Sequence, residues 1–171
     1  MKTVVALPGE GIGVEVVDAA CELMTAAGMP VKILTPPQTE APAVVGWLRW
    51  EMDVVVAMNQ YADILSDIAG EIAGGLGVAP FGNFGDDGWA YFESVHGSAP
   101  DIAGRGIANP TATILSTVLL LEHVGLAPEA ARLEAALSRV YRDGKTLAPD
   151  QGGSATTKQM AAAVLAAYRN A

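Results

Sequence analysis

The chain has 171 residues, of which 51% are hydrophobic, and this length and composition suit one compact domain around a single core. Nineteen acidic residues against ten basic ones give a formal net charge of −9, which opposes binding to nucleic acid or to an anionic membrane surface. The lone Cys21 has no partner for an internal disulfide, and no apolar run is long enough for a signal peptide or a membrane span, so we expect a cytoplasmic protein.

The first third of the chain predicts a strand, a helix, a strand and a linker. Residues 3–7 form a β-branched run ended by a Pro-Gly pair, as in buried parallel strands. Apolar residues at three- and four-residue spacing predict a helix over 14–27, and residues 31–34 predict a second strand. Three prolines make 35–42 an extended linker, the Pro-rich seam.

The middle of the chain continues this alternation. A short helical segment near 44–50 precedes a strand at 53–58 and a helix at 62–73 that ends at Gly74-Gly75. Residues 89–95 alternate as a strand does. Because strands and helices alternate, we expect a parallel sheet covered by helices on both faces.

The last third is helical. Asn109-Pro110 is typical of a helix start, with Asn as the cap and Pro at the first helical position. The helix up to His123 is apolar nearly all round, which places it in a core or a subunit interface, and His123 itself is expected to contact the last carbonyls of that helix. Amphipathic helices follow at 128–142 and 156–169, the second capped by a Ser or Thr.

Two glycine-containing segments are candidates for ligand binding. Residues 9–13 (GEGIG) lie between a strand and a helix, where backbone amides favour an anion, but Val14 replaces the third glycine of the dinucleotide fingerprint, and such turns are often only structural. In the long polar segment 93–110, His96 could stack on a base, Asp101 could accept ribose hydroxyls and Asn109 could pair with an adenine edge. The alternative is a packed histidine and an ordinary turn aspartate.

An acidic face is the third candidate. Asp63, Asp67 and Glu71 follow one another at four-residue spacing on the predicted helix 62–73. Clustered carboxylates suit a hard divalent cation, and they equally suit a solvated helix surface.

Four segments together resemble the isocitrate/isopropylmalate (β-decarboxylating) dehydrogenase family in their amino-acid sequence and in their order along the chain. They are residues 8–13 (PGEGIG), 62–80 (ADILSDIAGEIAGGLGVAP), 92–116 (FESVHGSAPDIAGRGIANPTATILS) and 149–157 (PDQGGSATT). The resemblance implies an α/β fold, a parallel-sheet three-layer domain like the large domain of that family. We therefore expect residues 1–171 to form a single nucleotide-binding α/β domain, with the Pro-rich seam replacing the missing small domain.

The resemblance also implies a cofactor site. It places around the adenosine half of the dinucleotide the residues Ile12, His96, Gly97, Ser98, Asp101, Ala108 and Asn109. NADP-dependent members carry Lys-Tyr where this chain has Asp101-Ile102. A carboxylate there would repel a 2′-phosphate and bond a free ribose diol, so the expected cofactor is NAD.

The metal and catalytic parts of the family pattern are less complete. Asp63 and Asp67 fall on the family's metal-binding aspartates, which hold Mg²⁺ or Mn²⁺, but the third has no clear counterpart beyond Glu40. The short stretch between Leu34 and Asp53 leaves no room for the family's substrate arginines, catalytic Tyr and Lys, or dimer-clasping arm. We therefore assign no catalytic residue, because orientation and proton removal both depend on such groups.

Three functions remain open at this point. The first is an NAD-binding module with weak or no oxidative decarboxylation. The second is an active NAD- and Mg²⁺-dependent 2-hydroxy acid oxidoreductase completed by a second chain. The third is a non-catalytic oligomeric interaction protein, and a homodimer is expected in all three.

Overall fold

The computed structural model describes residues 2–7, 12–35 and 54–170. Packing divides the chain into two compact units, residues 1–69 and 70–171, called here the N-terminal and the C-terminal unit. The single domain expected over 1–171 stays a prediction. Residues 36–42 of the Pro-rich seam (35–42) and the helical segment near 44–50 lie outside the described residues.

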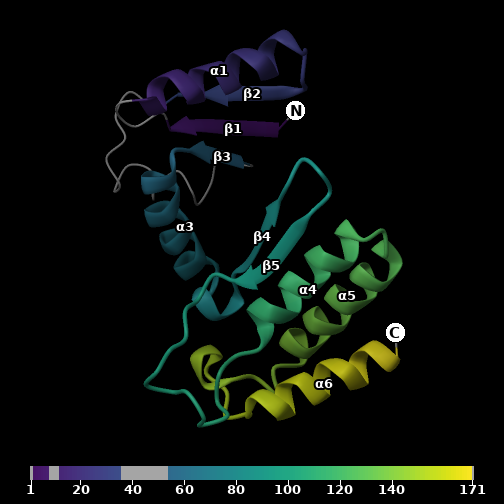
Figure 1. Ribbon diagram of the computed structural model, residues 1–171. Helices are drawn as coiled ribbons and strands as arrows, with labels where there is room; N and C mark the ends of the chain where they lie inside the picture. The colour runs from purple at the N-terminus through teal and green to yellow at the C-terminus, as the bar shows by residue number, and fades with distance from the viewer. Residues whose placement is uncertain (1, 8–11, 36–53, 171) are drawn as a thin grey trace. The chain divides into compact units, whose positions relative to one another are not determined.

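The N-terminal unit contains the parallel sheet that the sequence predicts. Its elements are β1 (Lys2–Leu7), α1 (Ile12–Ala26), β2 (Val31–Leu34) and β3 (Val54–Ala57), and the strand order is β2-β1-β3 (Figure 1). Both pairs are parallel, with Val4 opposite Ile33 in one and Val54 in the other. Val4 is buried with Ala6 and Val17, as the β-branched run and the helical spacing require.

Helix α3 (Asn59–Ala73) begins three residues before the position that the apolar pattern indicates, and its residues 70–73 belong to the C-terminal unit. It ends where predicted, because Gly74 and Gly75 adopt φ values of 127° and 101° that side-chain-bearing residues rarely take.

The C-terminal unit opens with a hairpin that corrects one expectation. Strands β4 (Pro80–Phe84) and β5 (Ala90–Ser94) pair with each other in an antiparallel sheet, whereas the sequence placed a strand at 89–95 in a parallel sheet. The partner strand was missed because Pro80, Gly82 and Asn83 are poor strand formers. The Gly85 N–H donates to the Trp89 carbonyl at 2.7 Å and closes the turn.

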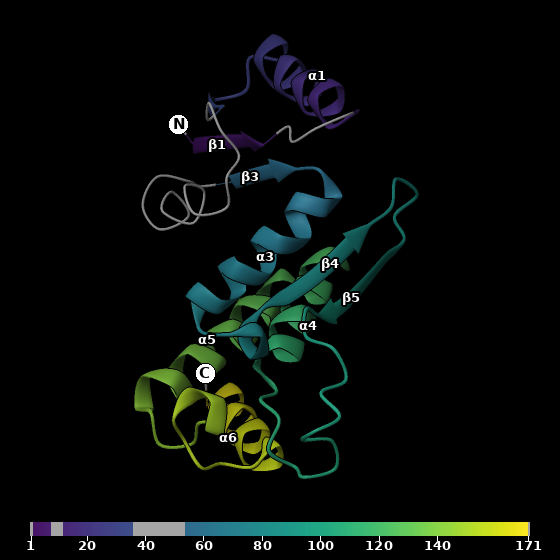
Figure 2. The same ribbon diagram turned by 90° about the vertical axis from the view of Figure 1, so that its left-hand side faces the viewer.

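Three helices complete this unit: α4 (Thr111–His123), α5 (Ala127–Asp143) and α6 (Thr157–Arg169). Helix α4 packs on β4, β5 and α5, and α5 packs on α6 (Figure 2). Their shared core includes Leu137, Val140 and Val164. Of the two environments expected for the apolar helix α4, the structure therefore provides a core. Short 3-10 turns, η1 (Leu76–Val78) and η2 (Pro149–Gln151), precede the hairpin and α6.

A buried serine joins the hairpin to α4. Ser116 is 3% exposed, and its Oγ lies 3.4 Å from the Phe81 amide, which donates to it. The same hydroxyl lies 2.5 Å from the Glu93 carbonyl and 3.0 Å from the Ala112 carbonyl, which share its one hydrogen. One side chain thus satisfies backbone groups of both strands and of its own helix.

His123 does not contact the last carbonyls of α4, so that expectation was wrong. Its Nε2 lies 3.0 Å from the carbonyl oxygen of Gly88 in the hairpin turn, and its ring packs against Phe84 and Phe92 at centroid distances of 5.6 and 5.7 Å. The aromatic contacts hold the ring over the hairpin, away from the helix axis.

Within the described part of the chain, every helix is too short or too polar to cross a lipid bilayer.

Candidate functional site

A cavity of about 720 Å³ lies within the C-terminal unit, beside the segment that the sequence singles out. Its wall consists mostly of residues 96–109, called here the 96–109 loop, with contributions from η1, η2 and the first turn of α6. Ile102, Ile107 and Pro149 give it apolar surface, and His96 is half-buried at its edge. This size and mixture are typical of sites for small ligands.

The 96–109 loop takes its shape from local backbone bonds and from residues with positive φ. The Ala99 carbonyl accepts the N–H groups of Ile102 and Ala103 at 3.0 and 3.1 Å. Ala99 itself has a φ of 43°, which is uncommon for a residue with a side chain, while Gly104 and Gly106 adopt positive φ without steric cost. Glycine at these two positions therefore lets the loop fold back on itself.

Asn109 fastens the end of this loop. It is 9% exposed, and its Oδ1 accepts the Thr111 N–H at 3.0 Å. Helix α4 starts at Thr111 with Pro110 at the N-cap position, one residue later than the expected start with Asn109 as the cap. Its amide nitrogen donates to Asp150 Oδ2 at 2.9 Å and to the Tyr141 hydroxyl at 3.4 Å. Because both ends of the amide are engaged inside the protein, Asn109 positions the loop.

Thr157 fastens the same loop to α6. Its backbone N–H donates to the Gly106 carbonyl at 2.9 Å, and its Oγ1 donates to the Ala108 carbonyl at 2.6 Å. Thr156 caps the helix in a capping box with Gln159, so the predicted Ser or Thr cap is confirmed.

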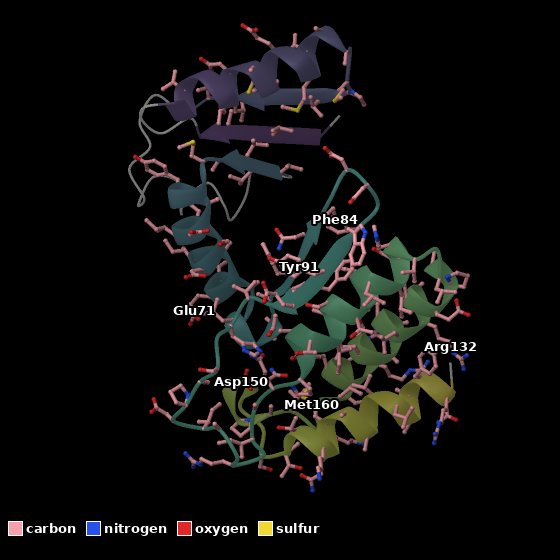
Figure 3. All side chains as sticks on the ribbon, in the orientation of Figure 1. Glu71, Phe84, Tyr91, Arg132, Asp150 and Met160 are labelled. Atoms are coloured by element: carbon pink, nitrogen blue, oxygen red, sulfur yellow. The ribbon has the colours of Figure 1, made fainter. Side chains whose placement is uncertain are left out.

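Two glycines allow close approaches near the cavity. A Cβ on Gly77 would lie 2.7 Å from Asp150 Oδ2, and a Cβ on Gly153 would run into the Leu147 backbone. Asp150 also lies 3.4 Å from Gln151 Nε2, and that amide donates to the Gly74 carbonyl at 2.6 Å. Figure 3 labels Asp150, which belongs to η2, and Met160 of α6. The η2 turn contributes Pro149 and Asp150 to the wall of the cavity.

The structure brings together five of the seven residues expected around adenosine. The residues that line the cavity are His96, Gly97, Ser98, Ala108 and Asn109. Asp101 belongs to the same loop but is exposed and does not line the cavity. Ile12 is the first residue of α1 in the N-terminal unit, and its side chain lies outside what the structure describes.

The expected metal pair lies on α3. Asp63 and Asp67 are both exposed on the helix, one turn apart, in the N-terminal unit. Across residues 2–7, 12–35 and 54–170 the structure places no group of three or more His, Cys, Asp or Glu side chains where they could hold one ion. Two carboxylates fall short of the six or more oxygen ligands that a hard cation takes, and waters would have to supply the rest.

Five residues of the cavity wall lie outside the segment 93–110 and received no binding role from the sequence: Gly77, Pro149, Asp150, Thr157 and Lys158. Asp150 lies in residues 149–157 (PDQGGSATT), one of the four segments that resemble the family, so the motif itself was a signal for this residue. Its contact with Asn109 joins residues 41 apart in the chain, and no spacing rule indicates such a pair.

The environment of Cys21 on α1 disfavours the charged form of its thiol. Partial burial, and then the nearby Asp18 carboxylate, raise the pKa of its thiol, because both disfavour the thiolate. This residue is a free cysteine and is half-buried on α1.

Comparison with known proteins supports the family resemblance that the sequence motifs indicate. A family model described as isocitrate/isopropylmalate dehydrogenase matches residues 48–164. The alpha subunit of mitochondrial NAD isocitrate dehydrogenase from Homo sapiens is 56% identical over 105 residues, which are 61% of this chain and 29% of that protein. The isocitrate/homoisocitrate dehydrogenase of Thermus thermophilus is 52% identical over 118 residues, 69% of this chain and 35% of that protein. The chain thus spans about a third of these relatives.

A solved structure extends the likeness over both units. The isocitrate dehydrogenase of Methylococcus capsulatus is similar with a TM-score of 0.78 at 34% identity, and the match covers 98% of this chain. It covers 50% of that enzyme, so half of the solved relative lies outside the match.

Proposed function

This chain belongs to the isocitrate/isopropylmalate dehydrogenase family, and from that premise we propose that its C-terminal unit binds the adenosine end of NAD. The observation that carries the proposal is the cavity of about 720 Å³ walled by the 96–109 loop. NAD, when bound, supplies the nicotinamide ring as hydride acceptor. The relatives include an enzyme whose name specifies NAD.

The chemistry of the cavity wall fits an adenosine. The side chains of Ile102 and Ile107 offer apolar surface for the faces of a base, and the half-buried His96 ring adds a group that can stack or hydrogen-bond. Asn109 serves as a positioning residue, because its amide already binds Asp150 and Thr111. Asp101 keeps its proposed role as the carboxylate that disfavours a 2′-phosphate.

We assign little or no oxidative decarboxylation to the chain by itself. A hydroxy acid with several carboxylates needs cationic groups to hold it, and Arg49 is the only Lys or Arg between Lys32 and Arg105. Asp63 and Asp67 remain a proposed Mg²⁺ or Mn²⁺ pair of low affinity, and no step of the proposal runs through a metal. A homodimer in the cytoplasm likewise remains a proposal, which light scattering of the purified chain would test.

Calorimetric titration with NAD tests the binding proposal. The Ala108→Phe variant should weaken NAD binding at least about tenfold, because a ring at that position takes up cavity space. Ala131→Phe, at an exposed position of α5, is the matched control and should leave the affinity unchanged. If NAD titrated into the unaltered chain produces no saturable heat of binding, the proposal is refuted.

An assay of NADH formation tests the proposed lack of turnover. Isocitrate, isopropylmalate and malate are each supplied with NAD and Mg²⁺, and we expect no rate above the background without protein. Saturable NADH formation with any of the three would instead favour the active oxidoreductase.

A further inference from the structure

Lys158 is the one Lys or Arg on the described wall of the cavity. It occupies the second position of α6, next to Thr157, which holds the 96–109 loop. Its flexible four-carbon stem lets the ammonium group reach over the cavity mouth while the backbone stays fixed in the helix.

The position of Lys158 is electrostatically unfavourable in the protein alone. The N-terminus of a helix carries partial positive charge, so a cation in the first turn is disfavoured there, and no acidic residue occupies that turn. Among the residues that the structure describes, Lys158 has no ion-pair or side-chain hydrogen-bond partner. An anion in the cavity would offset both the helix charge and the ammonium charge.

The other charged group on the wall is already engaged. Asp150 Oδ2 accepts the Asn109 amide at 2.9 Å and lies 3.4 Å from Gln151 Nε2, so neutral donors partly satisfy its charge. The neighbouring helix amides are also used, because Thr157 N donates to the Gly106 carbonyl and Gln159 N to Thr156 Oγ1. Lys158 therefore remains the free positive group of the cavity.

We propose that Lys158 binds a phosphate group of the nucleotide, so that the cavity selects phosphorylated adenosines over adenosine itself. This inference rests on the proposed function, because it requires an adenosine in the same cavity. It adds a determinant on α6 to the one expected at Asp101 on the loop. Lys158 would then attract a phosphate group, whereas the Asp101 carboxylate would repel a phosphate at the ribose 2′ position.

Calorimetric titration of the full chain with adenosine, 5′-AMP and 2′-AMP tests this role. We expect at least one phosphorylated form to bind more tightly than adenosine, and added salt to reduce that advantage. Lys158→Gln should weaken the preferred phosphorylated form by about five- to tenfold, the effect of one charge-assisted hydrogen bond, and leave adenosine unchanged. Lys158→Arg should retain most of the advantage.

Lys145→Gln is the matched control, because Lys145 is exposed and lies outside the cavity wall. This substitution removes the same charge from the whole chain as Lys158→Gln does. An advantage for 5′-AMP places the ammonium at the pyrophosphate side of NAD, and one for 2′-AMP places it at the ribose 2′ position. Equal binding of adenosine and both phosphates, or an unchanged profile in Lys158→Gln, would overturn the role of Lys158 alone. Absence of binding by adenosine and NAD alike would overturn the proposed function as well.

Discussion

The two units of this chain are fastened in different ways. In the N-terminal unit, Thr25 and Ser66 bond carbonyls only four and three residues away, while Val4, Ala6 and Val17 form the buried apolar contacts of the described sheet and helix. In the C-terminal unit, side-chain hydrogen bonds from Asn109 and Thr157 join residues 41 and 49 apart. Directional hydrogen bonds between distant residues specify one arrangement of the segments that they join. The C-terminal unit, which carries the cavity, contains long-range side-chain hydrogen bonds among its described residues.

The largest effect that would sharpen this contrast is expected at Gly153. Gly153→Ala places a methyl group against the Leu147 backbone, which cannot rotate away as a side chain can. We expect a loss of about 3 kcal/mol or more in the free energy of unfolding. Hydrogen exchange should rise in peptides from 70–171 and stay constant in those from 12–35. Gly97→Ala, whose Cβ would meet no atom within 4 Å, is the control, and equal exchange changes in both units would break the contrast.

A smaller loss is expected from Asn109. Asn109→Ala removes the acceptor of the Thr111 N–H and the amide that donates to Asp150 and Tyr141, at a cost of about 2 kcal/mol in urea unfolding. Asn170→Ala, at the exposed end of α6, should change the stability little. If the two variants unfold at the same urea concentration, the polar fastening contributes no stability.

Ser116 provides a closer test on a single helix. Ser116→Ala leaves the part-buried Phe81 amide and Glu93 carbonyl without this partner, and we expect a loss of about 1 to 2 kcal/mol. Its neighbour Thr117 bonds only the Thr113 carbonyl at the exposed surface. Thr117→Ala should therefore cost less than about 0.5 kcal/mol. A reversed order of the two variants would contradict the hydrogen-bond assignment.

The smallest effect concerns the N-terminal unit. Because burial and Asp18 raise the pKa of Cys21, less thiolate exists at a given pH and alkylation by iodoacetamide should be slow near pH 8. The rate should increase at a higher pH in the native chain than in the urea-unfolded chain. Asp18→Asn should shift the native profile to lower pH. Identical native and unfolded profiles would show that the α1 environment leaves the thiol unperturbed.

Local features of this fold could be predicted from the sequence, and long-range partners could not. Residues 31–34 form the expected strand, and Thr156 caps α6, because strand pattern and capping chemistry depend on near neighbours. The antiparallel partner of β5 was missed because Gly82 and Asn83 carry no strand signal. His123 and Gly88 are 35 residues apart, so only the folded chain reveals their contact.

The same limit applies to the candidate site. The 96–109 loop could be identified from its amino-acid sequence, and its residues His96, Gly97 and Ser98 do line one cavity. The hydrogen bond from the Asn109 amide to Asp150 could not be predicted from the sequence, because it depends on the position of η2 in the folded chain. Lys158 gave no sequence signal, because one lysine at a helix start is ordinary until a cavity wall is known.

The double attachment made by Thr157 has a consequence for protein engineering. Gly106 and Ala108 are held by a residue that the chain reaches only after two further helices and the η2 turn. If residues 96–109 were transplanted alone into another scaffold, the loop would therefore lose its fixed conformation and would not form the cavity wall. A working graft would have to carry residues 149–158 with it, in the same spatial register.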